Sequence, residues 1–285
     1  MHDFRHDTPG LRWPIQRIQQ GKCTPSSTPV VPEEPLEIIV NGYSIAVLMR
    51  LPGQEKELAA GFSISEGYVR RIEDIWLIHH CDRRCDPQPP APGESTDGDP
   101  AESRNRIILR VAEPGFSPPE CPDVIRLIRS GCGGADVSAL GETLPLLARD
   151  LIVQSATLLE LGKKMRARQI IHRQTGGAHA AALFDPLGDP LVVAEDIGRH
   201  NAIDKAIGSC LLGNKALQET ILVTSGRASY EMAAKAIRVG IPIAATISAP
   251  TSLAIRLAQD RGLTLIGYLR GGRMNVYTHA QRIRV

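Results

Sequence analysis

The stretch TILVTSGRASYEMAAKAIRVGIPIAATI, residues 220–247, decides the fold class of this chain. Its apolar run at 220–223 predicts a buried strand, and its amphipathic segment 229–239 predicts a helix that ends at Gly240. A second strand is expected directly after that helix. The same alternation continues outward in both directions, with strands or helices expected at 191–193, 201–212, 242–247, 251–259 and 263–268. Short connections between such elements are typical of an α/β domain with a mostly parallel sheet covered by helices.

The chain divides by composition into three parts. Residues 1–30 are polar, contain several prolines and show no periodicity, so we expect a disordered tail. Residues 31–122 predict a smaller N-terminal α+β region, interrupted by a disordered insert at 86–103, where Pro, Gly, Ser and acidic residues dominate. The α/β domain then occupies residues 123–285.

The N-terminal region opens with a hairpin signal. Apolar residues alternate on both sides of Asn41-Gly42, the dipeptide that most strongly favours a two-residue turn. Further elements are expected as a helix at 55–69, strands at 75–80 and 107–111, and a short amphipathic helix around 124–128.

Composition excludes several function classes. The 285 residues are enough for a core that needs no disulfide or zinc, and the 33 basic and 31 acidic residues leave a net charge of +2. Such a balance gives no general attraction to nucleic acid or to a membrane surface. The N-terminus shows no apolar targeting segment, and no apolar run is long enough to span a bilayer. We therefore expect a cytoplasmic protein that binds neither nucleic acid nor a membrane.

Four loops that follow the expected strands share one character. They combine Gly with Ser, Thr or Arg, residues that suit phosphate binding beside a helix start, and they lie at 195–201, 225–229, 248–252 and 270–273. In open α/β sheets, ligands bind beyond the carboxyl ends of the strands. Arg199, Arg227, Arg270 and Arg273 therefore predict a site for an anionic ligand with several phosphates, such as a nucleotide or a pyrophosphate-bearing cofactor. Ordinary helix caps and stops explain any one of these loops equally well.

The common nucleotide motifs are absent. The segment 131–136 has an aspartate where the last Gly of GxGxxG belongs, and Asn214 replaces the Gly that precedes the Walker A lysine. The zinc nucleobase deaminase signature also fails, because Ala181 lies where the glutamate of H-x-E belongs. Deamination by that mechanism is excluded, although a related scaffold is not.

Cys132 is the candidate reactive thiol. It lies in the segment Ser-Gly-Cys-Gly-Gly, which is open and offers no apolar neighbours, and Arg126 and Arg129 are close enough in sequence to favour the thiolate. A buried structural cysteine is the alternative, and this is the role we expect for Cys210 on its apolar helix face.

A second cysteine cluster, HHCDRRC at 79–85, has spacing that could hold zinc. No second pair of ligands with such spacing follows, so we expect no bound metal.

The motifs together resemble the formate dehydrogenase accessory sulfurtransferase family, FdhD. The matching blocks cover most of residues 36–278 in the family's order and are LAAGFSISEGYV (58–69), SGCGG (130–134), TGGAHAAAL (175–183), EDIGRHNAIDKAIG (195–208), SGRASYEMAAKA (225–236), SAPTSLAIRLA (248–258) and GYLRGGRMNVYT (267–278).

The resemblance implies a sulfur carrier, a sulfurtransferase that acts through a cysteine persulfide. Such a protein takes sulfur from a cysteine desulfurase and passes it to the molybdenum cofactor before the cofactor enters formate dehydrogenase. It also implies a cytidine-deaminase-like α/β/α layout, a homodimer, and Cys132 as the carrier cysteine. The cargo is the bis(molybdopterin guanine dinucleotide) form of the cofactor. The residues expected to bind it are Arg199, His200, Ser225, Gly226, Arg227, Tyr268, Leu269, Arg270, Gly271, Gly272 and Arg273.

One position departs from the family pattern. Many members carry C-G-x-C-G, whereas this chain has Ala135 in place of the second cysteine. A single thiol suffices for a persulfide relay but not for resolution by an internal disulfide. His179 and His200 are candidates for proton handling or for structural roles in their turns. Two other functions stay open, namely a non-catalytic chaperone for the cofactor and a nucleotide-binding α/β enzyme of unknown reaction.

Overall fold

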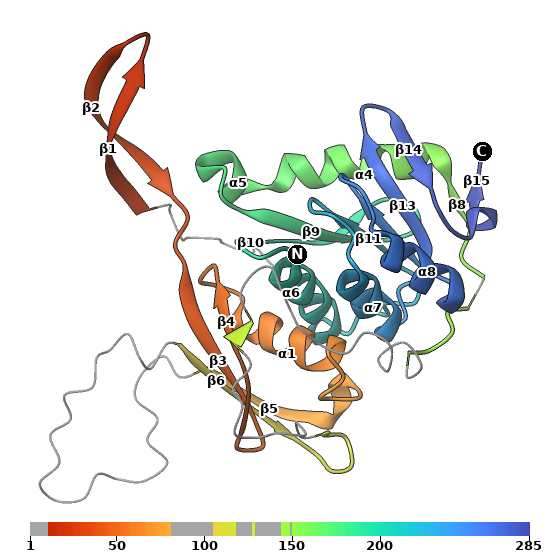
Figure 1. Cartoon of the computed structure of the whole chain (residues 1–285). Coiled ribbons are helices and arrows are strands. Elements are labelled where there is room, and N and C mark those ends of the chain that lie inside the picture. Colours follow the sequence, from red (N-terminus) through yellow and green to blue (C-terminus); the bar gives the residue numbers. More distant parts are fainter. Residues whose placement is uncertain (1–10, 81–104, 118–126, 129–143, 149) are drawn as a thin grey trace, which may run out of the picture.

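The computed structural model describes residues 11–80, 105–117, 127–128, 144–148 and 150–285. Two sheets dominate these residues, with helices packed between them, and a long two-stranded arm leaves the body at the N-terminal end (Figure 1). The carrier candidate Cys132, the expected insert at 86–103, Ala135 and the cysteines at positions 81 and 85 all lie outside the described residues.

The N-terminal sheet has five strands in the order β5-β6-β3-β4-β7. Their bounds are β3 (Glu34–Val40), β4 (Tyr43–Arg50), β5 (Ile75–His80), β6 (Arg106–Val111) and β7 (Leu127–Ile128). The expected hairpin is confirmed, because β3 pairs antiparallel with β4 and the turn residues Asn41 and Gly42 both have positive φ. Alternate residues of β3, namely Leu36, Ile38 and Val40, are fully buried. The sheet therefore turns one apolar face to the core.

Two helical segments follow the hairpin in the chain. They are α1 (Glu55–Ser65) and the short 3-10 turn η1 (Ile72–Asp74). The prediction of a helix over 124–128 is wrong at its end. Leu127 and Ile128 are extended and pair in parallel with Val47 and Leu48 of β4. Backbone pairing with an open sheet edge overrides the local helical pattern there.

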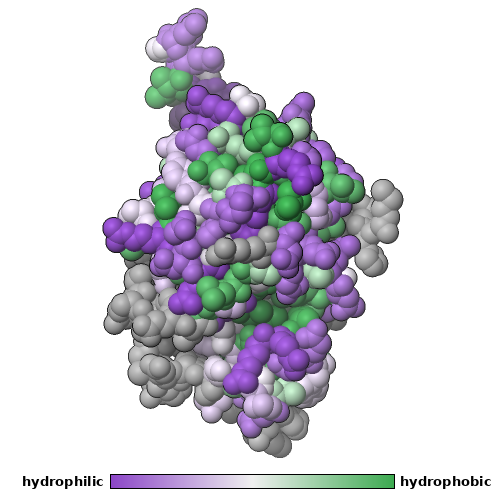
Figure 2. Space-filling view, turned by 90° about the vertical axis from the view of Figure 1, so that its right-hand side faces the viewer, coloured by the Kyte–Doolittle hydropathy of each residue, from purple (hydrophilic) through white to green (hydrophobic). Residues whose placement is uncertain are grey.

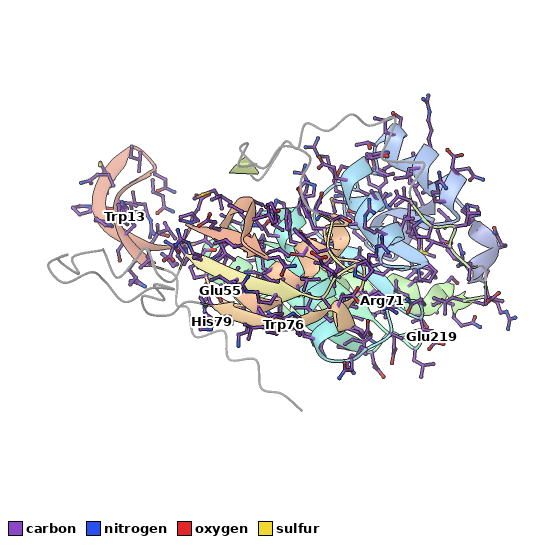
Figure 3. The ribbon with its side chains drawn as sticks, turned by 90° about the horizontal axis from the view of Figure 1, so that it is seen from below. Trp13, Glu55, Arg71, Trp76, His79 and Glu219 are labelled. Atoms are coloured by element: carbon purple, nitrogen blue, oxygen red, sulfur yellow. The ribbon has the colours of Figure 1, made fainter. Side chains whose placement is uncertain are left out.

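Residues 11–30 are not a disordered tail. They form an antiparallel hairpin of β1 (Leu11–Gln19) and β2 (Lys22–Val30), with Gln20 and Gly21 at positive φ in the turn. The arm is mostly exposed, and so is Trp13, which pairs with Thr28 near the end of the arm that joins the body (Figure 3). Prolines are tolerated because both strands are edges, where an outward-facing position needs no N–H. The sequence gives no apolar alternation because this pair buries almost nothing.

The second sheet has six strands in the order β10-β9-β11-β12-β13-β14. Their bounds are β9 (His179–Phe184), β10 (Pro190–Asp196), β11 (Ile221–Thr224), β12 (Ile243–Thr246), β13 (Thr264–Arg270) and β14 (Arg273–Val276). Only the pairs β11–β12 and β12–β13 are parallel, so the sheet is mixed and the prediction of a mostly parallel sheet is wrong. The difference arises because β9 inserts antiparallel between β10 and β11.

Helices cover both faces of this sheet. One face packs against α6 (Arg199–Leu212), α7 (Tyr230–Arg238) and α8 (Ser252–Arg261), and these share a continuous apolar core with α1 and the N-terminal sheet. The opposite face packs against α4 (Ser155–Arg168), where Leu158 and Leu161 meet Phe184. The remaining elements are α5 (Ile170–Thr175), the short parallel pair β8 (Val153–Gln154) and β15 (Ile283–Arg284), and η2 (Ala280–Arg282). The fold is thus a layered mixed α/β structure.

Helices α1 and α6 cross with their backbones in contact. A methyl group on Gly61 would lie 1.9 Å from the carbonyl oxygen of Asp204, and one on Gly208 would lie 1.9 Å from the carbonyl oxygen of Glu57. Both obstacles are backbone atoms that cannot move aside. The two glycines therefore fix how closely the N-terminal region and the α/β domain approach each other.

We predict that Gly61→Ala destabilises the protein by about 2 kcal/mol. Alanine would gain roughly 1 kcal/mol of helix propensity, but the overlap with α6 forces the helices apart, and overpacking of this kind costs about 1–3 kcal/mol or more. Urea denaturation followed by circular dichroism measures the change. Lys56→Ala, an exposed change on the same helix, should stay within about 0.5 kcal/mol of wild type. Equal stability of the two variants would contradict the close crossing.

Candidate functional site

The loops singled out in the sequence meet at one edge of the second sheet. Because β9 is antiparallel to both β10 and β11, strands β10, β11, β12 and β13 all run in the same direction. Their carboxyl ends therefore share an edge with the start of β9. The predicted gathering of the loops at 195–201, 225–229, 248–252 and 270–273 is confirmed.

Asp196, the last residue of β10, organises the first loop. Its buried carboxylate accepts hydrogen bonds from the backbone N–H groups of Leu51 (3.2 Å) and Gly198 (3.0 Å) and from Asn201 Nδ2 (3.0 Å). Lys205 Nζ lies 2.8 Å from Asp196 Oδ2 and donates to the carbonyl of Leu51 at 2.8 Å. The motif at 195–205 thus ties its own turn to the end of β4, which places Arg199 and His200 at the start of α6.

Glu195 is equally buried and serves a different element. Its carboxylate accepts three backbone N–H groups from the first turn of α5, those of Ile170, Ile171 and His172, at 2.7–2.8 Å. A carboxylate at a helix N-terminus satisfies donors that otherwise lack partners and complements the helix dipole. No role for Glu195 was predicted from the sequence. The signal was an acidic residue at the end of an apolar strand run.

Arg199 carries an open donor at the edge. Its aliphatic chain lies against Gly226, where an added methyl group would come within 3.0 Å of Arg199 Cδ. Its Nε is buried and has no hydrogen-bond partner among the described residues. A buried guanidinium donor without a partner is costly, and an anion bound at this edge would satisfy it.

His200, in contrast to Arg199, contacts a side chain of the neighbouring helix α7. Its Nε2 lies 3.0 Å from Glu231 Oε2, in the first turn of α7. The contact with His200 lowers the pKa of the Glu231 carboxyl below its ordinary value, against the opposing effect of burial. His200 therefore links α6 to α7, and one of its ring nitrogens is already engaged.

Ser225 connects the second loop to β9. Its Oγ accepts the backbone N–H of Ala180 at 2.9 Å and lies 3.2 Å from His179 Nδ1. Burial, followed by the charge of Arg199, lowers the pKa of the His179 imidazole below its ordinary value. The lowered pKa favours the neutral imidazole of His179 at pH 7.

The second and third loops are joined by their backbones. Ile247 donates to the carbonyl of Thr224, Ala228 donates to Ala249, and Thr251 donates to Ala228, all at 2.9–3.2 Å. Thr246 Oγ1 also donates to the carbonyl of Gly226. These bonds hold Ser225 and Gly226 in place, while the side chain of Arg227 is exposed.

The β13–β14 hairpin tip forms the far end of the edge. Gly271 and Gly272 have positive φ, and the exposed side chains of Arg270 and Arg273 face each other across the turn. The guanidinium of Arg270 lies 5.6 Å from the centre of the Tyr268 ring. The Leu269 side chain is 1% exposed and belongs to the core, so it is not available to a ligand.

The two ends of the edge are well separated. The Arg199 loop follows β10 and the Arg270 loop follows β13, four strand spacings away, which corresponds to about 19 Å. The site residues thus form a row along the edge and not one compact cluster. Such a row suits an extended ligand with charged groups along its length.

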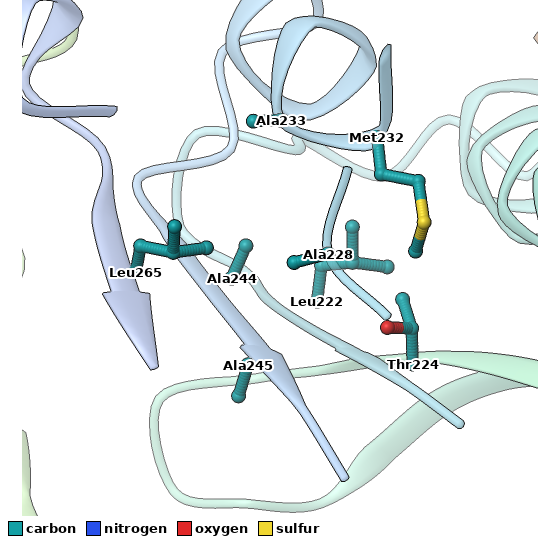
Figure 4. Close-up of a pocket in the computed structure, with 8 residues that line it drawn as sticks. All are labelled: Leu222, Thr224, Ala228, Met232, Ala233, Ala244, Ala245 and Leu265. Atoms are coloured by element: carbon teal, nitrogen blue, oxygen red, sulfur yellow. The ribbon is translucent and has the colours of Figure 1, made fainter. Parts of the chain in front are cut away.

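A small cavity lies behind the edge, between the sheet and α7 (Figure 4). Its lining is apolar apart from one hydroxyl and consists of Leu222, Thr224, Ala228, Met232, Ala233, Ala244, Ala245 and Leu265. Thr224 Oγ1 is buried without a hydrogen-bond partner among the described residues. The apolar lining does not suit an anionic ligand, so we assign the ligand to the exposed edge.

A further buried charge network was not foreseen. Lys235 Nζ contacts Asp204 at 2.9 Å, Glu66 at 2.6 Å and Ser65 Oγ at 2.9 Å. Burial alone would lower the pKa of Lys235, but the two carboxylates outweigh it and raise that pKa. The network joins α1, α6 and α7 beside the glycine contact. Its sequence signal was a charged residue among the apolar residues of each helix, Asp204 on α6 and Lys235 on α7.

The other cysteine and histidine expectations have mixed outcomes. Cys210 is buried, as predicted, and burial raises the pKa of its thiol to about 11. His79 and His80 lie on β5, with His79 and Trp76 on the side of the molecule seen in Figure 3. The described residues contain no group of three metal-ligating side chains, and none of their helices is both long and apolar enough to cross a membrane.

Comparison with known proteins gives a consistent result. A family model described as the FdhD/NarQ family matches residues 31–284. The sulfur carrier protein FdhD of Streptomyces avermitilis is 39% identical over 277 residues, covering 94% of each chain. That of Mycobacterium tuberculosis is 42% identical over 259 residues, covering 88% of this chain and 90% of its own. A crystal structure described as a formate dehydrogenase accessory protein, from Desulfotalea psychrophila, has a TM-score of 0.74 at 27% identity and covers 97% of this chain and 100% of its own.

We predict that Lys205→Met destabilises the protein by about 3–5 kcal/mol, because it leaves the buried Asp196 carboxylate without its cation. Adding Asp196→Asn should recover part of the loss, since the buried charge is then gone as well. Urea denaturation at pH 7 measures both variants. Lys215→Met, an exposed change after the same helix, serves as the control. A Lys205→Met protein as stable as this control would show that the ion pair does not anchor the turn.

Proposed function

Because the chain belongs to the FdhD/NarQ family, we propose that it is a sulfur carrier that loads sulfur onto the molybdenum cofactor for formate dehydrogenase. The observation that carries this proposal is the row of Arg- and Gly-bearing loops along one sheet edge, with the unpartnered Arg199 donor at one end and the exposed Arg270–Arg273 tip at the other. It is supported by relatives that are named sulfur carrier proteins.

The sulfur-loading step needs one thiol. The Cys132 thiolate attacks the outer sulfur of a cysteine desulfurase persulfide, a new S–S bond forms, and the bond in the donor breaks. The donor cysteine leaves as a thiolate, and the transferred sulfur keeps its proton. No electrons are gained or lost overall, so neither a second cysteine at position 135 nor an external oxidant is required.

The cargo is the guanine dinucleotide form of the molybdenum cofactor. Its pyrophosphate groups extend over a length greater than one loop, so hydrogen-bond donors from several loops are needed to bind them. Arg199, Arg227, Arg270 and Arg273 offer guanidinium groups along the edge, which suit phosphate oxygens bidentately. Ser225 and Gly226 allow close approach of the backbone, and Tyr268 offers a ring beside Arg270.

These residues hold the cargo in place and contribute to sulfur transfer by positioning. We assign the client role to formate dehydrogenase and the donor role to a cysteine desulfurase. The protein acts in the cytoplasm, where reducing conditions keep a carrier thiol free. A homodimer and a cytidine-deaminase-like arrangement of the second domain complete the proposal. The layered mixed sheet with helices on both faces is compatible with that arrangement.

A non-catalytic chaperone is the alternative, and Cys132→Ala separates the two. Incubation with a desulfurase and cysteine should add one sulfur, a mass of about 32 Da, to wild type and none to the variant, while affinity for guanosine diphosphate is unchanged. Intact-protein mass spectrometry and calorimetry give the two readouts. Cys210→Ala is the control, because its buried thiol should accept no sulfur. Full maturation of formate dehydrogenase with Cys132→Ala would favour the chaperone.

We expect Arg273→Ala to have the converse effect. Loss of one guanidinium should weaken guanosine diphosphate binding about tenfold, which corresponds to about 1.4 kcal/mol, while persulfide still forms at Cys132. Calorimetry measures the affinity. Arg284→Ala removes an exposed arginine on β15, outside the edge, and should leave it unchanged. Unchanged affinity in Arg273→Ala would show that the hairpin tip is not part of the cofactor site.

A further inference from the structure

Three histidines lie near the carboxyl edge, and each has one engaged ring nitrogen. His172 Nδ1 lies 2.8 Å from the carbonyl oxygen of Ala178, which accepts only from a protonated nitrogen. His200 Nε2 faces the Glu231 carboxylate. His179 Nδ1 faces a hydroxyl, that of Ser225. A hydroxyl can donate or accept, so the proton arrangement at His179 has to be derived from the other contacts of Ser225.

The contacts of Ser225 decide the tautomer of His179. The Ser225 oxygen already accepts the Ala180 N–H at 2.9 Å, and the only acceptor within hydrogen-bond distance of its hydroxyl among the described residues is His179 Nδ1. A serine oxygen can accept a second hydrogen bond, but only donation to Nδ1 gives the hydroxyl hydrogen a partner among the described residues, so we take the hydroxyl to donate to Nδ1. A neutral imidazole whose Nδ1 accepts must carry its proton on Nε2.

The surroundings of His179 keep the ring neutral. The titratable and charged groups that face it are Arg199 and His200 on α6, His172 on α5 and Asp196 on β10. Asp196 is already engaged by Lys205 at 2.8 Å. Partial burial and the Arg199 guanidinium both oppose a positive charge on the ring.

Ser225 also places this ring beside the open arginine. The next residue, Gly226, is the one against which the Arg199 side chain packs, and Arg199 Nε is the buried donor without a partner. No described residue engages His179 Nε2. Two donors without partners, one charged and one neutral, thus lie at the same end of the edge.

We propose that His179 is a cofactor-binding residue that donates an uncharged hydrogen bond from Nε2–H to a phosphate oxygen of the bound nucleotide, beside Arg199. Ser225 is its positioning residue, because it fixes the tautomer. This inference rests on the proposed function and assigns a neutral donor to a site otherwise described by its arginines. A neutral donor adds specificity for a phosphate oxygen without adding charge.

The first test examines the tautomer in the protein without nucleotide. The full-length chain, labelled with ¹⁵N-histidine, is studied by NMR at pH 7.5, and His179→Gln identifies the His179 signals by their loss. We expect the Nε2–H form in wild type and a mixture of tautomers in Ser225→Ala. A predominant Nδ1–H form in wild type would overturn the proposal.

The second test uses guanosine diphosphate as the probe. The amide nitrogen of glutamine can replace His Nε2, whereas that of asparagine corresponds to Nδ1, so His179→Gln should bind nearly as wild type and His179→Asn about tenfold more weakly. Because the donor is uncharged, the ratio of wild-type to Asn affinity should stay constant from pH 7 to pH 8.5. Thermal melting confirms that both variants are folded.

Equal affinity of His179→Asn and wild type would overturn the proposal, as would a ratio that falls with rising pH, which would indicate a charged imidazolium. Failure of wild type itself to bind guanosine diphosphate would remove the cofactor site and the role of His179 with it. The tautomer measurement needs no nucleotide, so an Nε2–H signal combined with absent binding would locate the failure in the proposed function and not in the derived geometry.

Discussion

The buried contact between Asp196 and Lys205 is the constraint on which the site depends. Both groups are almost fully buried, and together they bind the N–H and the carbonyl of Leu51 at the end of the N-terminal sheet. A buried ion pair adds little net stability by itself, but removal of one partner is costly. The value of the pair is therefore geometric, because it fixes the turn from which α6 and Arg199 begin.

Other polar residues of the motif at 195–208 also have structural roles. Glu195 holds α5, Asp196 and Lys205 hold β4, and Asp204 holds Lys235 of α7. Most of these side chains are therefore structural, and they bring three elements together at one edge of the second sheet. The residues left for a ligand are few, chiefly Arg199 and the neighbouring His179–Ser225 pair. The number of polar residues in a motif is thus a poor measure of how many could contact a ligand.

Sequence patterns predicted elements whose stability comes from apolar burial or from a defined turn. The Asn41-Gly42 hairpin and the strands and helices of residues 220–268 are of this kind, and so is the gathering of the loops at one edge. The strand at 179–184 could not be identified, because its alanines have low strand propensity and are buried on both faces without alternation. The arm at 11–30 is held by pairing alone. The contacts of His179 and Glu195 depend on tertiary neighbours that no local pattern contains.

The backbone contact between Gly61 and Gly208 limits how the edge can adapt to a ligand. Helices whose backbones touch cannot slide past each other, so the α6 end of the row of loops is rigid. Two glycines and two ion networks hold it in place. The opposite end of the row is a solvent-exposed turn that contains two glycines, Gly271 and Gly272. Among the described residues, adjustment to ligands of unequal length therefore falls to this turn, while the α6 end keeps its position.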